Sequence, residues 1–170
     1  MPETTPTPLR ALSVHQPWAD LIARGHKTIE TRGYARKHRG PLLICATQSY
    51  DKLAQLITSK YQHRGPHPDS FWDRPLFDPN YQPRLGVALA TCQLVDCRPM
   101  VAADRKRAGF FRSWSIEDKF SWVLEDVRPI LPIPIVGRQG LFDPTNQGVT
   151  GPLTLDTIEY LQPTLFEEAA

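Results

Sequence analysis

Apolar residues along this chain come in short runs, most of them bounded by proline, glycine or charged residues. Four of these runs predict strands, at residues 10–14, 41–47, 85–97 and 120–127. In the last run, alternation places Phe120, Trp122 and Leu124 on one face. A final short strand or turn is expected at 137–142, and a strand or a helix at 153–161. The pattern therefore predicts a domain built mainly of β-strands.

One helix is well marked near the start of the chain. Pro17 suits the first helical position, where its missing N–H is not needed. Trp18, Leu21 and Ile22 fall at helical spacing and form one apolar face, and Gly25 suits the left-handed residue just past a helix end. Because this helix is only about two turns long, packing against the rest of the protein must hold it in place.

The residues after this helix alternate in a way that predicts another strand, at 27–32. In a regular strand one face carries the polar residues Thr28, Glu30 and Arg32, and the other carries Lys27, Ile29 and Thr31. A basic loop is expected to follow at 33–40.

A second helix is predicted at 49–61, where Leu53, Leu56 and Ile57 form an apolar stripe. The next stretch, 62–84, contains five prolines, and no regular element survives that density. A loop of this length is usually functional or partly disordered. Its aromatic residues either serve a site or attach the loop to the rest of the fold; they are Phe71, Trp72, Phe77 and Tyr81.

Length and composition fit a single domain with its own hydrophobic core. The chain has 170 residues, of which 41% are hydrophobic and 22% are charged, values that are ordinary for a globular protein. Its 17 prolines and 10 glycines favour short, turn-rich elements. We therefore expect an α+β fold with a flexible leader at 1–9, one domain at 10–162 and an acidic tail at 163–170.

The distribution of charge is more informative than the net charge of +2. Between residues 24 and 39 there are six lysines and arginines and one acid, Glu30, whereas residues 143–170 contain five acids and neither lysine nor arginine. This asymmetry favours a basic site for an anion. The alternative is that both stretches are ordinary solvated surface.

The cysteines and histidines indicate neither a disulfide framework nor a metal site. The chain has an odd number of cysteines, Cys45, Cys92 and Cys97, and they form no C-x-x-C pair. All three lie in apolar runs, which is typical of buried free thiols and fits a reducing compartment. The five histidines show no ligand spacing, so we expect no metal and no cofactor. No apolar run has membrane-spanning length or resembles a signal core. We therefore expect a cytoplasmic protein without membrane contact, monomeric by default.

The densest chemistry lies between residues 12 and 39. The short helix and the strand after it bring together His15, Gln16, Trp18, Lys27, Thr28, Glu30 and Arg32. Such a set suits a planar polar ligand, because Trp18 could stack on a base and Gln16 could pair with a base edge. Lys27 and Arg32 could hold a phosphate.

Each of these residues also has a purely structural interpretation. Trp18 on a short amphipathic helix could belong to the core, and His15 could only orient the start of the helix. Glu30 could form an ordinary ion pair with Lys27 or Arg32. Lys27 is harder to explain in this way, since a lysine beside a threonine and a glutamate in a cleft can have its pKa tuned for proton transfer.

The segment LSVHQPWADLIARGHKTIETR resembles the signature of the ASCH domain, a relative of the PUA, YTH and EVE barrels. HRGPLLICAT, the strand at 85–96, FSWVLEDVRPI and PIPIVGRQGLF are also similar to bacterial and phage members, and the family includes a domain of eukaryotic activating signal cointegrator. The resemblance covers residues 11–142. It implies a small PUA-like β-barrel with a few short helices packed around it. It also implies a cleft along the G-x-K-T-x-E-x-R strand that binds RNA or DNA.

Some ASCH proteins are enzymes, and the resemblance implies which residues would act. One bacterial branch hydrolyses N4-acetylcytidine with a lysine and a threonine of this strand and a distant glutamate; another reported activity is ribonuclease. Lys27 matches the lysine, but Glu30 stands at the position of the threonine and Thr28 is displaced by two residues. A glutamate cannot replace a threonine nucleophile without changing the mechanism, and the distant glutamate has no clear match.

Three functions therefore remain open from the sequence. The favoured one is a nucleic-acid-binding module for RNA or DNA that uses His15, Gln16, Trp18, Lys27, Thr28, Glu30, Arg32, Tyr34, Arg36, Lys37 and Arg39, with Arg24 and a second patch at Arg105, Lys106 and Arg107. The alternative is a metal-independent hydrolase of RNA or a modified nucleoside, with Lys27 and Glu30 as its acid–base pair and Thr28 or Arg32 orienting the substrate. The third is a reader of an unusual base through an aromatic cage of Trp18, Trp114 and Trp122.

Overall fold

A computed structural model describes residues 8–52, 81–110, 112–146 and 153–162. Its elements are the strands β1 (Arg10–Gln16), β2 (Ile29–Arg32), β3 (Gly40–Tyr50), β4 (Val87–Pro99), β5 (Phe120–Pro134) and β6 (Leu141–Phe142), the helices α1 (Trp18–Ala23) and α3 (Arg105–Ala108), and the 3-10 turns η1 (Ala102–Asp104) and η2 (Pro144–Asn146).

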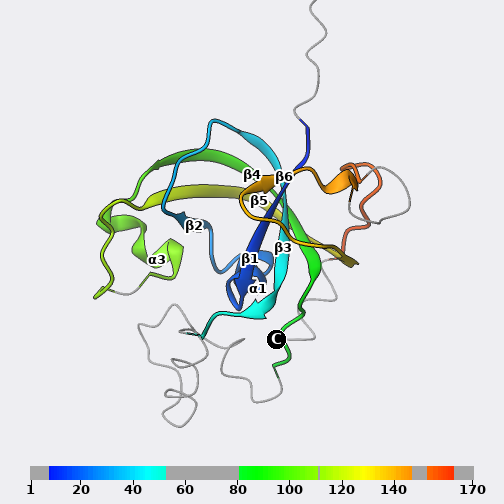
Figure 1. Ribbon diagram of the computed structural model, residues 1–170, viewed down its shortest axis with the longest axis horizontal. Helices are drawn as coiled ribbons and strands as arrows, with labels where there is room; N and C mark the ends of the chain where they lie inside the picture. Colours follow the sequence, from blue (N-terminus) through cyan, green and yellow to red (C-terminus); the bar gives the residue numbers. More distant parts are fainter. Residues whose placement is uncertain (1–7, 53–80, 111, 147–152, 163–170) are drawn as a thin grey trace, which may run out of the picture.

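The strands form one curled sheet in the order β2-β5-β4-β3-β1-β6. β1 runs parallel to β3, and the other neighbours are antiparallel. Figure 1 shows the long strands β4 and β5 arching over α1, with α3 beside the start of β2. The expected α+β fold, a small barrel-like sheet with short helices, is confirmed as a six-stranded half-barrel.

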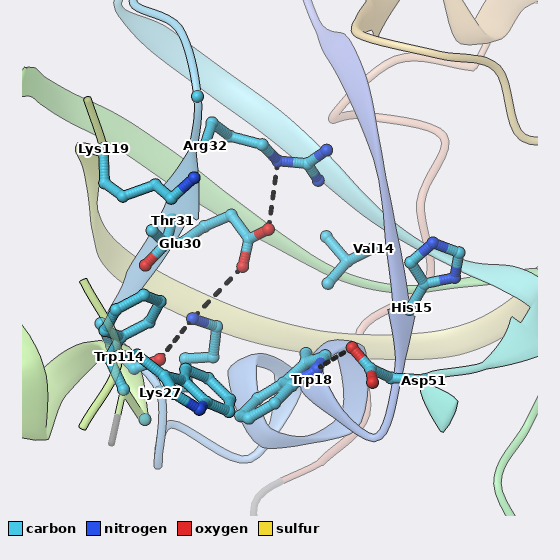
Figure 2. Close-up of a pocket in the computed structure, with 14 residues that line it drawn as sticks. Val14, His15, Trp18, Lys27, Glu30, Thr31, Arg32, Asp51, Trp114 and Lys119 are labelled. Atoms are coloured by element: carbon cyan, nitrogen blue, oxygen red, sulfur yellow. Dashed lines mark hydrogen bonds and ion pairs between the residues drawn. The ribbon is translucent and has the colours of Figure 1, made fainter. Parts of the chain in front are cut away.

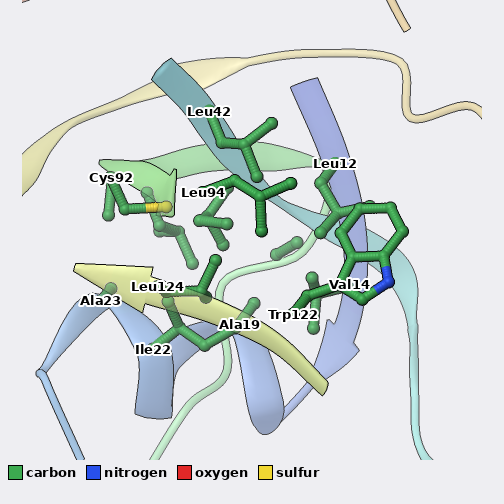
Figure 3. Close-up of a cluster of buried hydrophobic side chains, with 14 residues drawn as sticks. Leu12, Val14, Ala19, Ile22, Ala23, Leu42, Cys92, Leu94, Trp122 and Leu124 are labelled. Carbon is green, nitrogen blue, oxygen red and sulfur yellow. The ribbon is translucent and has the colours of Figure 1, made fainter. Parts of the chain in front are cut away.

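The main core lies between the concave face of the sheet and α1 (Figure 3). Trp122 is fully buried there, and Phe120 and Leu124 join the same cluster, as their alternation predicts. α1 buries Leu21 and Ile22, and Gly25 adopts a left-handed backbone with φ +75° just after it. Packing therefore holds this short helix, and its glycine stop turns the chain directly toward β2.

A second cluster covers the other face of β3 and β1 and includes residues of the described segment 153–162. Leu153 and Ile158 pack there, and Tyr160 forms a single bridge with Ile130. The sequence predicts either a strand or a helix at 153–161. The structure has a turn there, followed by this bridge. Leu9, in the predicted leader, also packs against this cluster.

β5 continues well past residue 127, where the prolines of the sequence predict its end. β2 pairs with residues 120–123 of β5, and further along this edge residues 159–161 bond to Pro129 and Leu131. Among the described residues, the rest of this edge of β5 has no ladder partner. A proline needs no ladder partner for its nitrogen at such an edge. The strand therefore runs through Pro129 and Pro132 to Pro134.

Several other predicted bounds shift, and some predictions fall on residues that are not described. Ser49 and Tyr50, expected to begin a helix, instead end β3. Residues 53–61 of that predicted helix, residues 62–80 of the aromatic loop, residues 1–7 of the leader and the tail at 163–170 lie outside the described residues. Cys45 and Cys92 are buried free thiols as expected, and burial raises their pKa to about 12. Cys97 is also free but only half-buried. None of the helices in the described ranges is long and apolar enough to cross a membrane.

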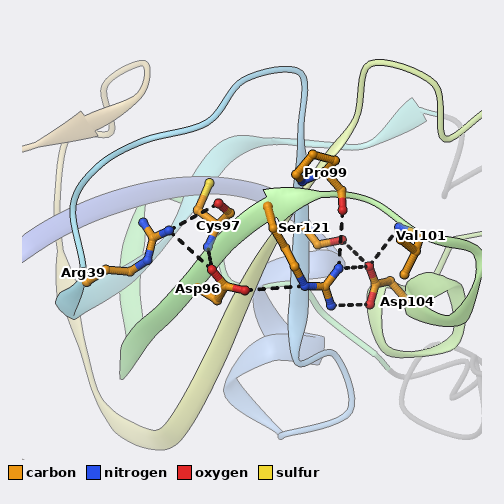
Figure 4. Close-up of polar contacts among 8 residues, drawn as sticks. Arg39, Asp96, Cys97, Pro99, Val101, Asp104 and Ser121 are labelled. Carbon is orange, nitrogen blue, oxygen red and sulfur yellow. Dashed lines mark hydrogen bonds and ion pairs between the residues drawn. The ribbon is translucent and has the colours of Figure 1, made fainter.

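An ion pair between Arg98 and Asp104 fixes the start of the α3 region against the sheet (Figure 4). Arg98 donates from Nη1 and Nη2 to the two carboxylate oxygens of Asp104, over 2.7 and 2.8 Å. The Ser121 hydroxyl and the Val101 N–H also donate to this carboxylate. These bonds hold the pKa of Asp104 well below its usual range, the Arg98 bond contributing most.

Replacing Asp104 with asparagine is expected to lower the free energy of unfolding by about 2 kcal/mol at neutral pH, because hydrogen bonds to a charged partner are lost. That figure is modest because the Arg98 side chain is 37% exposed. Asp104 has a lowered pKa when folded, so its contribution is complete above the ordinary pKa of aspartate and is lost as pH falls through the folded value.

Urea unfolding at neutral and acid pH tests this prediction. The difference between wild type and Asp104→Asn should shrink on acidification. Asp96→Asn is the matched control, since its 47% exposed carboxylate should contribute less than about 1 kcal/mol. A difference that stays constant into acid would contradict the assignment.

Candidate functional site

A pocket of about 500 Å³ opens beside β2, between α1 and the segment that follows α3 (Figure 2). It is lined by Val14, His15, Trp18, Lys27, Glu30, Thr31, Arg32, Gly33, Asp51, Ala108, Gly109, Phe110, Trp114 and Lys119. Four chain segments therefore contribute to it, and two of them, at residue 51 and at 108–119, are distant in sequence from the other two. Its size is within the range of small-molecule sites in proteins.

Lys27 reaches the pocket because it lies in the connection between α1 and β2. The Lys27 N–H donates to Leu21 O, so the chain turns sharply here. β2 begins only at Ile29, and the alternation of a strand therefore does not include Lys27. The side chain consequently lies on the side of Glu30 and not, as predicted, on that of Ile29 and Thr31. Lys27 Nζ donates to Ile29 O over 2.5 Å and to Ala108 O over 2.7 Å, and lies 3.3 Å from Glu30 Oε2.

Lys27, Glu30 and Arg32 form one chain of charges in the pocket. Arg32 Nε lies 3.1 Å from Glu30 Oε1, and Arg32 Nη2 donates to Ser13 O over 2.7 Å. The Lys27 side chain is only 3% exposed, whereas that of Arg32 is 22% exposed. Burial lowers the pKa of Lys27, the Glu30 carboxylate opposes this shift, and Arg32 adds to it. The carboxylate thus shares its two oxygens between two cations.

Two indoles face this charged group. Trp18 is half-buried, and its Nε1 donates to Asp51 Oδ2 over 3.1 Å. Trp114 packs edge-to-face on Phe110 with ring centroids 4.9 Å apart. Lys27 Nζ lies 5.5 Å from the Trp18 ring centroid. In Figure 2 the two tryptophans lie on one side of the Lys27–Glu30 pair and Arg32 on the other. The pocket therefore has an aromatic side and a charged side.

His15 stands at the mouth of the pocket with two hydroxyls beside it. His15 Nδ1 lies 2.9 Å from Thr47 Oγ1 and 3.0 Å from Ser49 Oγ. The imidazole is exposed and lies on β1 just before the helix. It can donate or accept a hydrogen bond toward a ligand entering the pocket.

Two of the predicted site residues, Gln16 and Thr28, do not line the pocket and instead make contacts that hold the fold together. Gln16 is fully buried, donates from Nε2 to Arg84 O over 2.8 Å, and accepts the Asp20 N–H at Oε1. Both ends of its amide are therefore bonded within the protein, where they fix α1. Thr28 Oγ1 accepts a hydrogen bond from Arg107 Nε over 3.0 Å, which ties the start of β2 to α3.

Apart from Gly33, the basic loop between β2 and β3 also lies outside the pocket lining. Arg36 stacks on Tyr34, with its guanidinium 4.3 Å from the ring centroid, and Arg39 pairs with Asp96 over 3.4 Å. Lys37 is exposed. Tyr34 itself packs edge-to-face on Trp122, whose Nε1 donates to Tyr34 O. Trp122 is thus core, which removes it from the aromatic cage considered above.

Sequence reasoning missed several lining residues. Asp51 and Lys119 come from distant segments and carry no local pattern that points to a site, and Thr31 lies in the predicted segment but was placed only on a strand face. Phe110 follows Gly109, which has φ +64° and ends α3. A glycine directly after the short basic run RKRA was the available signal that the chain turns back here.

The lining carries three cations, Lys27, Arg32 and Lys119, against two carboxylates, Glu30 and Asp51. Such a pocket can accept a planar group against the indoles and a group with one negative charge or a carbonyl near Arg32. In the described ranges no three histidines, cysteines or acids gather as metal ligands would.

Comparison with known sequences and structures places these features in context. A family model described as "ASCH domain" matches residues 12–134. Activating signal cointegrator 1 of Homo sapiens is 37% identical over 89 residues, and that of Mus musculus is 36% identical over 89 residues. Each match takes in 51% of this chain but only 14% of the relative.

Among solved structures, the crystal structure of ASCH from Zymomonas mobilis is 14% identical, with a TM-score of 0.45. The comparison covers 95% of this chain and 92% of that one. A crystal structure of a point mutant of the same Zymomonas mobilis protein gives the same TM-score and identity and covers 95% of each chain.

Proposed function

The chain belongs to the ASCH domain family, and we propose that it is a nucleic-acid-binding protein that holds one nucleobase of RNA or DNA in the pocket beside β2. The observation that carries this proposal is that one pocket has an aromatic side and, opposite it, a polar side. Trp18 and Trp114 offer aromatic faces, and Glu30 and Arg32 offer fixed polar groups opposite them. Base stacking on aromatic side chains is the common mode of single-strand recognition.

The charged side of the pocket is organised before any ligand arrives. Glu30 is held by Lys27 and Arg32, and Arg32 is held in addition by Ser13 O. Among the described residues, Arg32 Nη1 has no hydrogen-bond partner, so it can donate to a base carbonyl or a phosphate. Lys27 has three acceptors around its nitrogen, which matches the three N–H donors of an ammonium group. In this proposal Lys27 positions Glu30, and Arg32 contacts the ligand.

Fluorescence anisotropy with labelled single-stranded RNA, single-stranded DNA and duplex DNA tests the proposal. We expect binding of at least one of them at low salt and weaker binding as salt rises, because phosphate contacts release counterions. Arg32→Ala should weaken binding about 10-fold.

Arg128→Ala is the matched control for this experiment. It removes an exposed arginine that packs on Tyr160, on the part of β5 beyond β2, and it should leave binding within about twofold. Absence of binding at low salt, or equal losses in the two variants, would contradict the proposal.

One observation favours a hydrolase as the competing function. Lys27 has a pKa lowered by burial and contacts Glu30 inside the pocket, as an acid–base pair would. The resemblance implies RNA or N4-acetylcytidine as substrates to incubate with the protein. Product formed by wild type and lost in Lys27→Ala would favour the enzyme, whereas no product with either substrate would favour a binding module.

A further inference from the structure

Two groups of basic residues flank the pocket, one at each end of β2. Arg107 at the first end is bound to Thr28, which directly precedes the strand: Thr28 N donates to Arg107 O over 3.0 Å. The loop with Arg36, Lys37 and Arg39 follows the other end of the strand. β2 has four residues, so the two groups are separated by roughly 13 Å along the strand. Figure 1 shows the β2–β3 connection running away from α3.

The cations of the β2–β3 loop are largely engaged within the protein. Arg39 donates to Arg36 O, His38 O and Cys97 O and pairs with Asp96. Arg36 stacks on Tyr34 and donates to Ala35 O. A phosphate would have to compete with these contacts for both guanidinium groups. Only Lys37 of this loop lacks a side-chain partner among the described residues.

The cations near the start of β2 are different. Arg24 and Lys106 are exposed, and neither side chain has a hydrogen bond or ion pair with a described residue. Among the described residues, Arg107 makes one side-chain hydrogen bond, from Nε to Thr28 Oγ1, which leaves its two terminal nitrogens for other partners. Arg24 follows α1 and precedes Thr28 by four residues, and Lys106 and Arg107 belong to α3. We define these three residues as the α3 basic face. Their charges are available to an external anion without breaking an internal contact.

This face is continuous with the pocket. Ala108, Gly109 and Phe110 follow α3 without interruption and line the pocket. Lys27 Nζ donates to Ala108 O, which fixes the end of α3 against the pocket floor. A strand with one base in the pocket would therefore have its neighbouring phosphates within reach of the α3 basic face.

We propose that the sugar–phosphate backbone of the bound nucleic acid leaves the pocket across the α3 basic face and not across the β2–β3 loop. This inference rests on the proposed function, and it specifies where the phosphates lie. Free lysine and arginine side chains beside a base pocket are the usual anchors for a backbone, since phosphate contacts set the position and orientation of the bound strand.

The test compares two charge-matched double variants in anisotropy titrations with single-stranded RNA at several salt concentrations. Arg24→Gln/Lys106→Gln removes two cations from the α3 face, at positions whose side chains hold no internal contact in the described structure. Arg36→Gln/Lys37→Gln removes two cations from the loop. We expect the first variant to bind on the order of 10-fold more weakly at about 0.1 M salt. Its log–log salt slope should fall by about 1.4.

The loop variant should stay within about twofold of wild type and keep its slope. The opposite order, or equal losses in both variants, would overturn the inference while leaving the proposed function in place. Absence of RNA binding by the wild-type protein at low salt would overturn the proposed function and this inference with it. If the wild type binds polyglutamate as tightly as RNA, the α3 basic face binds acidic proteins and the inference is overturned.

Discussion

A variant with Trp18→Leu and Trp114→Leu is expected to bind single-stranded RNA about 100-fold more weakly than the wild type, a loss of about 2.7 kcal/mol. Base stacking on an aromatic ring is worth about 1–3 kcal/mol per base, and both indoles of the pocket are removed here. Leucine is chosen because Trp18 also packs against the main core and an alanine would leave a void there.

Tyr160→Leu is the matched control for this loss. It removes an aromatic ring from the second cluster, on the other face of the sheet from α1, and should leave RNA affinity within about twofold. Anisotropy titrations of the two variants and the wild type give the comparison directly. An affinity that does not change in the double leucine variant would show that the indoles are only structural.

Glu30→Gln is expected to lower the free energy of unfolding by about 3 kcal/mol at neutral pH. The carboxylate is buried between Lys27 and Arg32, so its removal leaves the almost fully buried Lys27 ammonium with two carbonyl partners and no opposite charge. Breaking a buried pair by removing one partner is costly because the remaining charge stays desolvated.

The same variant should show a characteristic dependence on pH. Burial lowers the pKa of Lys27 and Glu30 opposes that shift, so the pKa should fall further without the carboxylate. Above that lowered pKa and below the ordinary lysine value of about 10.4, the unfolded chain then binds more protons than the folded one. The free energy of unfolding therefore rises with pH across this window, and Glu30→Gln should regain stability toward alkaline pH.

Urea unfolding from neutral to alkaline pH measures both effects. Glu125→Gln is the matched control, because this exposed carboxylate on β5 should contribute less than about 0.5 kcal/mol at any pH. A Glu30→Gln variant as stable as the wild type, or one that loses stability steadily on alkalinisation, would contradict the role given to Glu30.

The strands and the first helix could be predicted because their signals are local. Alternation at Phe120, Trp122 and Leu124, and the Pro17 and Gly25 bounds of α1, depend on residues close in sequence. The extension of β5 through Pro134 could not be predicted in this way. It depends on β2 being too short to cover the free edge of β5, and this is a property of the assembled sheet.

The candidate site could be predicted only in part for the same reason. Trp18, Lys27, Glu30 and Arg32 lie within one short segment, and the structure brings them together at the pocket as expected. Trp114 and Lys119 reach the same pocket because contacts between distant segments hold the residues around α3 against β2, among them the Arg98–Asp104 pair and the Lys27 contact with Ala108. Gln16, in contrast, is buried outside the pocket lining. This could not be predicted, because a buried amide that fixes a helix and an amide that reads a base look alike in sequence.

The most direct test of the central claim uses two short RNA-like strands with the same number of phosphates. One lacks every base, and the other carries a single base at its centre. We predict that the single base raises the affinity of the wild type at least about 10-fold and gives no such gain in Trp18→Leu/Trp114→Leu. Equal affinity of the wild type for the two strands would contradict the claim that the pocket holds a base, because the phosphates alone would then account for binding.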